Sequence, residues 1–410
     1  MISDSDKPKI RPLNAFPVEA HGRQAICMQD PLRLTDKQVI VDHETYFIIS
    51  MMDGEHDITD IQLAYTRKFG DLLLNSRINS LLVELDKNLL LESGRLQEAI
   101  ERLSKEFRKE PLRRAEHVGT AYEEEPEKLR AQLDEVMKLA SLENGGKSRM
   151  TRLLRGIIAP HIDIRAGAEG YARAYKCVAE AEPADLYVIL GVSHVHTARE
   201  FVLTDKDFET PLGISRTDKG FVEGLQKSLS MDYMVDELAH KGEHSIEFQV
   251  LFLQHVIGDR EYRIVPILCS GFHEQVEQDV LPEMDADIRE FLDALKEKVE
   301  DYPGKVCIIA GVDLSHVGQK FGTPGPLGPT QVKAVEFIDQ EMLKIIQRDG
   351  TLGFFRHIEE DKNGRNVCGF AAIYSLLYLI KGSKVELLHY GSHYEAVTSS
   401  MVSFASMAFC

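Results

Sequence analysis

The stretch VCIIAGVDLSHVG, residues 306–318, passes from a short apolar run typical of a buried β-strand directly into an aspartate and a histidine. Two further stretches share this design: GIIAPHIDIRAG at residues 156–167 and LYVILGVSHVH at residues 186–196. Proteins with an open α/β sheet bind ligands in the crevice outside the carboxyl ends of the strands. The three stretches therefore predict a sheet that gathers polar side chains at one edge.

Other strand-like runs, such as YRIVPIL, VELLHYG and SMVSFASMAF, alternate with helical segments from Gly156 onward. This alternation predicts an α/β fold with a mixed central sheet and helices on both faces. A chain of 410 residues, 43% of them hydrophobic, can form more than one domain with a full core.

The composition narrows the range of partners. A formal net charge of −18 argues against a large nucleic-acid or anionic-membrane footprint, because phosphate binding uses clustered Lys and Arg. The apolar runs are shorter than a membrane span, and MISDSDKPKIRP has no apolar signal core, so we expect a soluble cytoplasmic protein. The six cysteines have no CxxC spacing, which favours free thiols.

Two histidines and one cysteine are the candidate metal ligands. His161 and His194 each follow a strand-like run. His196, two residues after His194, is the alternative ligand or a residue that supports His194. Cys368 precedes the helix-like run FAAIYSLLYLI, and a helix N-terminus favours a thiolate by lowering the pKa of the thiol. Imidazole and thiolate suit iron, copper and zinc. The alternatives are a hydrogen-bonded structural histidine and a cysteine that packs as a small hydrophobe.

Two further pairs are candidate catalytic residues. Asp313 and His316 are three residues apart, which on a helical turn would place carboxylate and imidazole side by side as an acid/base pair. Glu243 and His244 begin the amphipathic segment EHSIEFQVLFLQ, where they could orient a ligand or contact substrate. For each pair the alternative is a helix cap or an acidic residue at a helix N-terminus.

Residues 1–93 resemble the PqqD-like winged-helix family in the segments HETYFIISMMDG, ITDIQLAYTRKFG and DKNLLLE. That resemblance implies a peptide or protein partner, including a radical-SAM enzyme. A DNA-binding role fits worse, because residues 1–100 hold eleven Lys and Arg against sixteen Asp and Glu, a net charge of −5. A helical dimerisation or packing module is the equal alternative. Residues 94–111 are expected to form a helical connector.

Residues 112–410 resemble the Memo family, whose bacterial members are labelled AmmeMemoRadiSam system protein B. The resemblance is carried by RRAEHVGTAY, APHIDIRAG, LGVSHVH, EHSIEFQVLFLQ, VDLSHVG, NVCG and SMVSFASMAF, which occur in the family's order. It implies a fold like that of class III extradiol dioxygenases and a pocket associated with iron and copper.

The resemblance also assigns roles to residues. It implies metal ligation by His161, His194 and Cys368, with Asp313 and His316 lining the same pocket. Two departures matter. A cysteine stands where the dioxygenases have a glutamate, which softens the site. The sequence PHIDIR stands where some Memo proteins have PHAGY, which alters the pocket wall.

Three hypotheses follow for the function. In the first, an oxidoreductase holds iron(II) at this site and works with a substrate-sized pocket. In the second, the same residues bind iron or copper without turnover, or form a docking surface. In the third, the N-terminal module recruits a peptide or a radical-SAM partner to the Memo-like domain.

Overall fold

The computed structural model describes residues 6–20, 22–30, 34, 39–140 and 154–410. The chain divides into two compact units, Met1–Lys109 and Glu110–Cys410. Each unit has its own hydrophobic core: one cluster of buried residues in the first unit and two large ones in the second. Among the described residues, no helix combines the length and the apolar character needed to cross a bilayer.

The described residues of the first unit form a small antiparallel sheet and four helices. The sheet has the order β1 (Asn14–Ala20), β2 (Arg23–Gln29), β3 (Val39–Val41). The helices are α1 (His43–Ser50), α2 (Ile58–Phe69), α3 (Asn75–Lys87) and α4 (Gly94–Lys109). Helix α2 begins at Ile58 because Asp57 caps it and forms a reciprocal capping box with Asp60. Strands β1 and β2 were not expected from the sequence.

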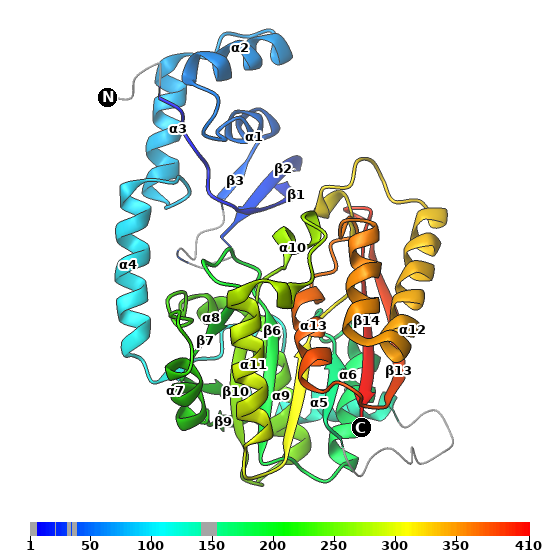
Figure 1. Cartoon of the computed structure of the whole chain (residues 1–410). Coiled ribbons are helices and arrows are strands. Elements are labelled where there is room, and N and C mark those ends of the chain that lie inside the picture. The colour runs from blue at the N-terminus through cyan, green and yellow to red at the C-terminus, as the bar shows by residue number, and fades with distance from the viewer. Residues whose placement is uncertain (1–5, 21, 31–33, 35–38, 141–153) are drawn as a thin grey trace. The chain divides into compact units, whose positions relative to one another are not determined.

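The second unit is built on an eight-stranded mixed sheet (Figure 1). Its strand order is β12 (His316–Gly318), β14 (Ser400–Phe409), β5 (Gly156–Ala159), β11 (Val306–Gly311), β6 (Leu186–Val192), β10 (Arg263–Cys269), β7 (Phe201–Leu203), with β13 (Val385–Glu395) paired to β14. The central strands β5, β11, β6 and β10 are parallel, and β14 and β7 run antiparallel to them. The mixed sheet expected from the sequence is therefore present.

The central strands of this sheet are buried on both sides, because helices cover both of its faces. Leu186, Val188 and Leu190 point into one core cluster, whereas Tyr187 and Ile189 point into the other. The first cluster includes residues of α11 (Ala286–Glu300), α12 (Pro329–Glu360) and α13 (Phe370–Leu379). The second includes residues of α5 (Pro126–Leu139), α6 (Ala168–Glu180) and α9 (His244–Ile257).

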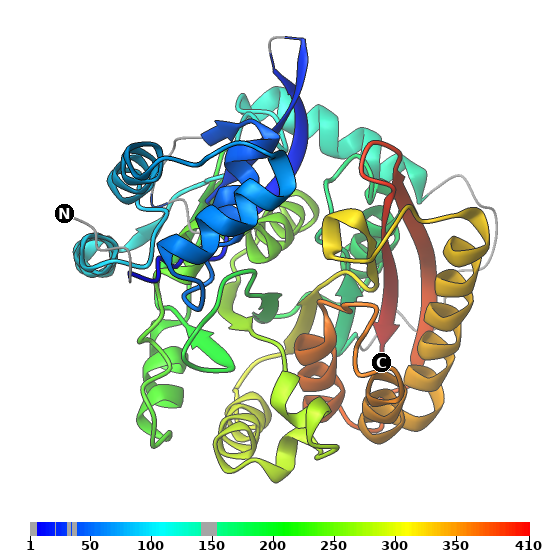
Figure 2. The ribbon, with the colours of Figure 1, turned by 90° about the horizontal axis from the view of Figure 1, so that it is seen from above.

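The remaining elements are short and lie around this sandwich. A small sheet has the order β4 (Leu112–Arg113), β8 (Asp207–Thr210), β9 (Gly213–Ser215). The short helices are α7 (Lys219–Lys227), α8 (Ala239–Gly242), α10 (His273–Glu277) and the 3-10 turns η2 (Pro282–Met284) and η3 (Gln319–Phe321). Helix α12 is kinked at Gly350, where φ is 62°. Figure 2 shows α12 lying along the hairpin of β13 and β14.

Candidate metal centre

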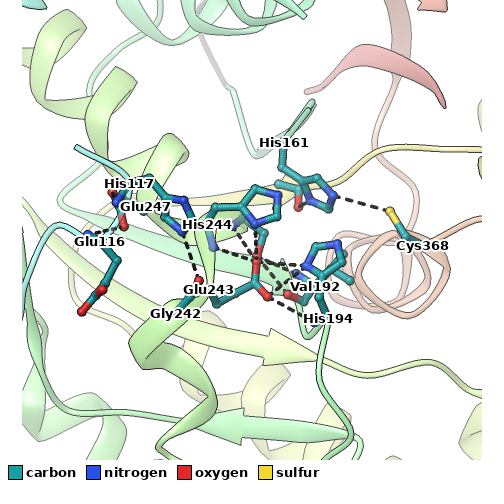
Figure 3. A network of polar contacts seen from close by, with 12 residues as sticks. Glu116, His117, His161, Val192, His194, Gly242, Glu243, His244, Glu247 and Cys368 are labelled. Carbon is teal, nitrogen blue, oxygen red and sulfur yellow. Dashed lines mark hydrogen bonds and ion pairs between the residues drawn. The ribbon is translucent and has the colours of Figure 1, made fainter. Parts of the chain in front are cut away.

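Three adjacent parallel strands deliver the candidate residues to one edge of the sheet. Strand β11 lies between β5 and β6, and Ala310 is in register with Ile158 and Leu190. His161, Asp313 and His194 each follow the last residue of β5, β11 or β6 by two positions. The strand ends therefore bring together residues that are far apart in the sequence, as Figure 3 shows for His161 and His194.

His161 is buried and held in one orientation. Its Nδ1 lies 2.9 Å from the carbonyl oxygen of Gly311, so Nδ1 carries the hydrogen and Nε2 keeps its lone pair. Its backbone N–H donates to Asp313 Oδ1 at 3.0 Å. Burial, reinforced by His194 and His244, lowers the pKa of His161 well below its usual value. The ring is therefore neutral at pH 7, the form that binds metals.

His194 is oriented by Glu243. Its Nδ1 lies 2.9 Å and 3.1 Å from the two carboxylate oxygens, and its backbone N–H donates to the same carboxylate at 3.1 Å. Burial lowers the pKa of His194, but the negative charge of Glu243 outweighs burial and leaves this pKa raised. Because Nδ1 is engaged, Nε2 is the nitrogen left for a further ligand.

Cys368 precedes α13, whose N-cap is Gly369, so it lies near a helix N-terminus as expected. Its Sγ is 3.6 Å from His161 Nε2 and 3.5 Å from the Asp313 carbonyl oxygen. Burial and the Asp313 carboxylate raise the pKa of Cys368 well above its usual value, which opposes the thiolate expected from the helix N-terminus.

The donor atoms of His161, His194 and Cys368 all lie within 4.8 Å of one another. Zinc and similar ions sit about 2.0–2.3 Å from such nitrogen and sulfur donors, so the group is compact enough for one ion after small side-chain shifts. Two imidazoles and the thiolate that Cys368 would become by losing its proton to a bound ion are donors that suit iron, copper and zinc. A set of three protein ligands also leaves coordination positions open.

Asp313 and His316 do not share a helical turn, which corrects the sequence expectation. Residues 312–315 form a loop, and His316 begins β12 because it pairs with Val402 of β14. Asp313 is buried and accepts the backbone N–H groups of His161 and Ile162. The Asp313 carboxylate therefore fixes the loop that carries His161.

His316 lies beside this loop with its ring anchored. Its Nδ1 donates to the Leu314 carbonyl oxygen at 3.0 Å, which leaves Nε2 as the basic nitrogen. Burial lowers the pKa of His316 to about 4, against an opposing effect of Asp313. His316 is therefore a neutral imidazole at pH 7 with a free lone pair.

Glu243 serves both of the roles considered from the sequence. It caps α9 by accepting the backbone N–H groups of His244 and Ser245 at 2.8 Å and 2.9 Å, and it also holds His194. Burial raises the pKa of Glu243, but His194 and His244 outweigh burial and hold this pKa well below its usual value. The carboxylate is therefore ionised.

His244 joins the same cluster. Its ring stacks on His194 with the centroids 4.9 Å apart and lies 5.1 Å from the ring of His161. With Glu243 and His194 it forms a second group of potential metal-binding atoms. In that group, the Glu243 carboxylate and His194 Nδ1 already pair with each other. His196 is exposed and belongs to neither group of potential ligands found among the described residues.

Two buried networks around the site were missed from the sequence. Arg113 and Glu247 form an ion pair, and both side chains are inaccessible to solvent. Tyr122 also donates to Glu247. Arg113 and Tyr122 lie in RRAEHVGTAY, so the motif contained a signal, although its link to the EHSIE segment emerges only in three dimensions.

The second network centres on Asp339 of α12, which is fully buried. It accepts hydrogen bonds from Ser315, Ser403, Tyr390 and Arg365. These partners lie on separate elements, so no local sequence pattern reveals them.

Comparisons with known proteins place the sequence beside one family. The sequence model of the Memo family, described as Memo-like protein, matches residues 113–408. A MEMO1 family protein of Aquifex aeolicus is 31% identical over 406 residues, covering 98% of this chain and all of that protein. Another, of Thermus thermophilus, is 25% identical and covers 87% of this chain and 99% of its own length. A third, of Pyrococcus furiosus, is 27% identical and covers 72% of this chain and 98% of its own length.

The family match spans nearly all of the second unit, and it includes each strand end that carries a candidate ligand. The chain belongs to the Memo family.

Proposed function

We propose that this chain binds one redox-active transition-metal ion, iron(II) before copper, through His161 Nε2, His194 Nε2 and Cys368 Sγ. The observation that carries the proposal is the anchoring of both imidazoles at Nδ1, by Gly311 and by Glu243, which leaves Nε2 of each ring available beside the sulfur. Hydrogen bonds of this kind orient histidine ligands in metal sites. The neutral state of His161 supports the same assignment.

We further propose that the site is that of an oxidoreductase related to the class III extradiol dioxygenases. A bound iron ion would supply one-electron chemistry at its open positions. The residues contribute positioning and proton transfer: Asp313 holds the loop of His161, and the free Nε2 of His316 accepts or returns a proton.

For the first unit we propose recognition of a peptide or of a radical-SAM partner. The support is its resemblance to the PqqD-like winged-helix family. Panning a peptide display library against the full chain and against residues 110–410 tests this proposal. Peptides captured only by the full chain would support it, and equal capture by both would contradict it.

The metal proposal is tested by the metal content of anaerobically purified protein incubated with iron(II), copper(I) or zinc. We expect one ion per chain in the wild type and loss of that ion in Cys368→Ser and His161→Gln. His196→Ala is the matched control, because His196 is exposed and adjoins the site in sequence. Absence of metal from the wild type, or undiminished metal in both ligand variants, would overturn the proposal. Tight metal binding without turnover of any substrate would instead favour a protein that binds iron or copper without catalysis.

A further inference from the structure

A pocket of about 710 Å³ lies next to the candidate metal centre. Its wall combines apolar and charged side chains from the segment after β5 and from β12 to β14: Ile162, Asp163, Arg165, Ala166, Lys320, Phe321, His393, Glu395, Ser400 and Val402. Ile162 adjoins His161 in sequence, and its backbone N–H donates to Asp313. One wall of the pocket is therefore the loop that carries a candidate ligand.

The register of the sheet places His316 on the same face as this pocket. Val402 of β14 pairs with His316 of β12 on one side and with His393 of β13 on the other. Residues directly opposite one another in antiparallel strands have side chains on the same face. His316, Val402 and His393 therefore form a row, and two of these three residues line the pocket.

Phe321 connects the pocket with His316 directly. It lines the pocket, and its ring packs edge-on against the His316 imidazole with the centroids 5.0 Å apart. Val402 and Phe321 provide an apolar surface beside His316, and Ile162 adds to the apolar lining of the same pocket. A molecule held on that surface would lie next to the proposed acid/base group.

The charges of the pocket differ in how well they are paired. The Arg165 guanidinium donates hydrogen bonds of 3.0 Å and 2.7 Å to the two Asp163 carboxylate oxygens, so these two charges neutralise each other. Lys320 Nζ is 3.6 Å from Glu395, beyond direct hydrogen-bond distance, and Glu395 already accepts the Thr398 hydroxyl at 2.6 Å. Lys320 is also 45% exposed. It is therefore the cation in this pocket best placed to bind an added anion.

We propose that this pocket binds an amphipathic organic carboxylate, with its apolar part on Phe321, Ile162 and Val402 and its carboxylate on Lys320. As the substrate class of the metal site, this assignment rests on the function proposed above. His393, an exposed imidazole on the same wall, adds a second donor for the anion.

The proposal also gives a role to the PHIDIR sequence. Ile162, Asp163 and Arg165 all line the pocket, at the point where the chain departs from the PHAGY of some Memo proteins. The Arg165–Asp163 ion pair forms part of the wall of this pocket. These residues are the specificity-determining positions of the proposed site.

The test is titration of the full chain, free of metal, with three probes that share one apolar body: hexanoate, hexan-1-ol and hexylamine. We expect hexanoate to bind with a dissociation constant on the order of 1 mM. The alcohol and the amine should bind about tenfold more weakly, because they lose the charge-assisted bond to Lys320. Calorimetry or ligand-observed NMR measures all three.

Two variants localise the binding. Lys320→Met and Phe321→Ala should each weaken hexanoate binding about tenfold. Lys344→Met is the matched control, since Lys344 is an exposed lysine of α12 paired with Glu341. This variant should bind hexanoate as tightly as the wild type does. No hexanoate binding by the wild type, equal binding in Lys320→Met, or a preference for the amine would overturn the proposal.

Metal uptake, measured on separate portions of the same preparations after incubation with iron(II), separates this proposal from the previous one. Metal uptake that survives Lys320→Met while hexanoate binding is lost supports both proposals. Hexanoate binding that depends on Lys320 in a wild type that takes up no metal overturns the metal site and, with it, the assignment as substrate. Metal uptake without hexanoate binding overturns the carboxylate pocket alone.

Discussion

A single carboxylate, that of Glu243, connects the start of a helix with the orientation of a candidate ligand. It caps α9 and engages the Nδ1 of His194 in the same position. We predict that Glu243→Gln lowers metal affinity about 10–100-fold, because the ring loses its ionised partner. Metal titration with a competing chelator measures this change.

The control for the loss of a helix cap is Asp285→Ala at the start of α11, where Asp285 accepts two backbone N–H groups. This variant should cost about 1 kcal/mol of stability and leave metal affinity unchanged. Equal metal affinity in Glu243→Gln and the wild type would show that Glu243 is only a cap.

His240 makes a separate contribution at the scale of the residue, through pH. It is buried, and burial lowers its pKa to about 3, with further lowering by Arg113 and Lys206 and partial opposition from Glu243. In the unfolded chain an imidazole titrates at about 6.5. Between these two values the unfolded state binds the extra proton, so stability falls as the pH falls.

We therefore predict that His240→Gln loses less stability than the wild type between pH 7 and pH 5. Thermal unfolding of the metal-free protein at the two pH values gives the comparison. An identical loss in both proteins would mean that His240 does not stay neutral in the folded state.

At the scale of the element, Asp339 joins α12 to the loop before β12 and to β14. Its removal leaves the buried guanidinium of Arg365 with Asp361 as its remaining ionic partner. We predict that Asp339→Ala destabilises the protein by about 3 kcal/mol, the lower end of the cost of breaking a buried ion pair. Unfolding in urea measures this loss.

Asp349, which lies on the same helix and forms an exposed pair with Arg348, provides the comparison. Asp349→Ala should change stability by less than about 0.5 kcal/mol. Similar effects of the two substitutions would contradict the structural role assigned to Asp339.

The elements also show which parts of the fold could be predicted from sequence. The apolar runs before His161 and His194 predicted strands because a strand buried on both faces has a continuous hydrophobic signature. The helical turn expected at Asp313 and His316 was wrong, because a spacing of three residues does not reveal that His316 pairs with β14. Pairing between strands distant in sequence decides that geometry.

The chemistry at the site was predicted less completely than its location. The position of Cys368 before a helix was foreseen, but the raised pKa of its thiol depends on burial and on Asp313. The partner of His194 also comes from a distant segment, at Glu243. Local sequence thus identified residue types and strand ends, whereas protonation and hydrogen-bond partners depend on tertiary contacts.

At the scale of the whole molecule, the boundary between the two units nearly coincides with the start of the family match. The second unit begins at Glu110 and the Memo match at residue 113. The relative in Pyrococcus furiosus is covered over 98% of its length while more than a quarter of this chain stays outside the match. Family members thus exist without a counterpart to part of this chain.

We predict from this that residues 110–410 fold alone and take up the same metal per chain as the full protein. The three candidate ligands and the residues that orient them lie within this unit, and its hydrophobic core is drawn from the same unit. Calorimetry of the truncated chain should give one cooperative transition, while metal analysis should match the full chain under the same loading. A truncated chain that folds but takes up no metal would show that residues 1–109 contribute to the metal site itself, and an unfolded one would show that the two units depend on each other for stability.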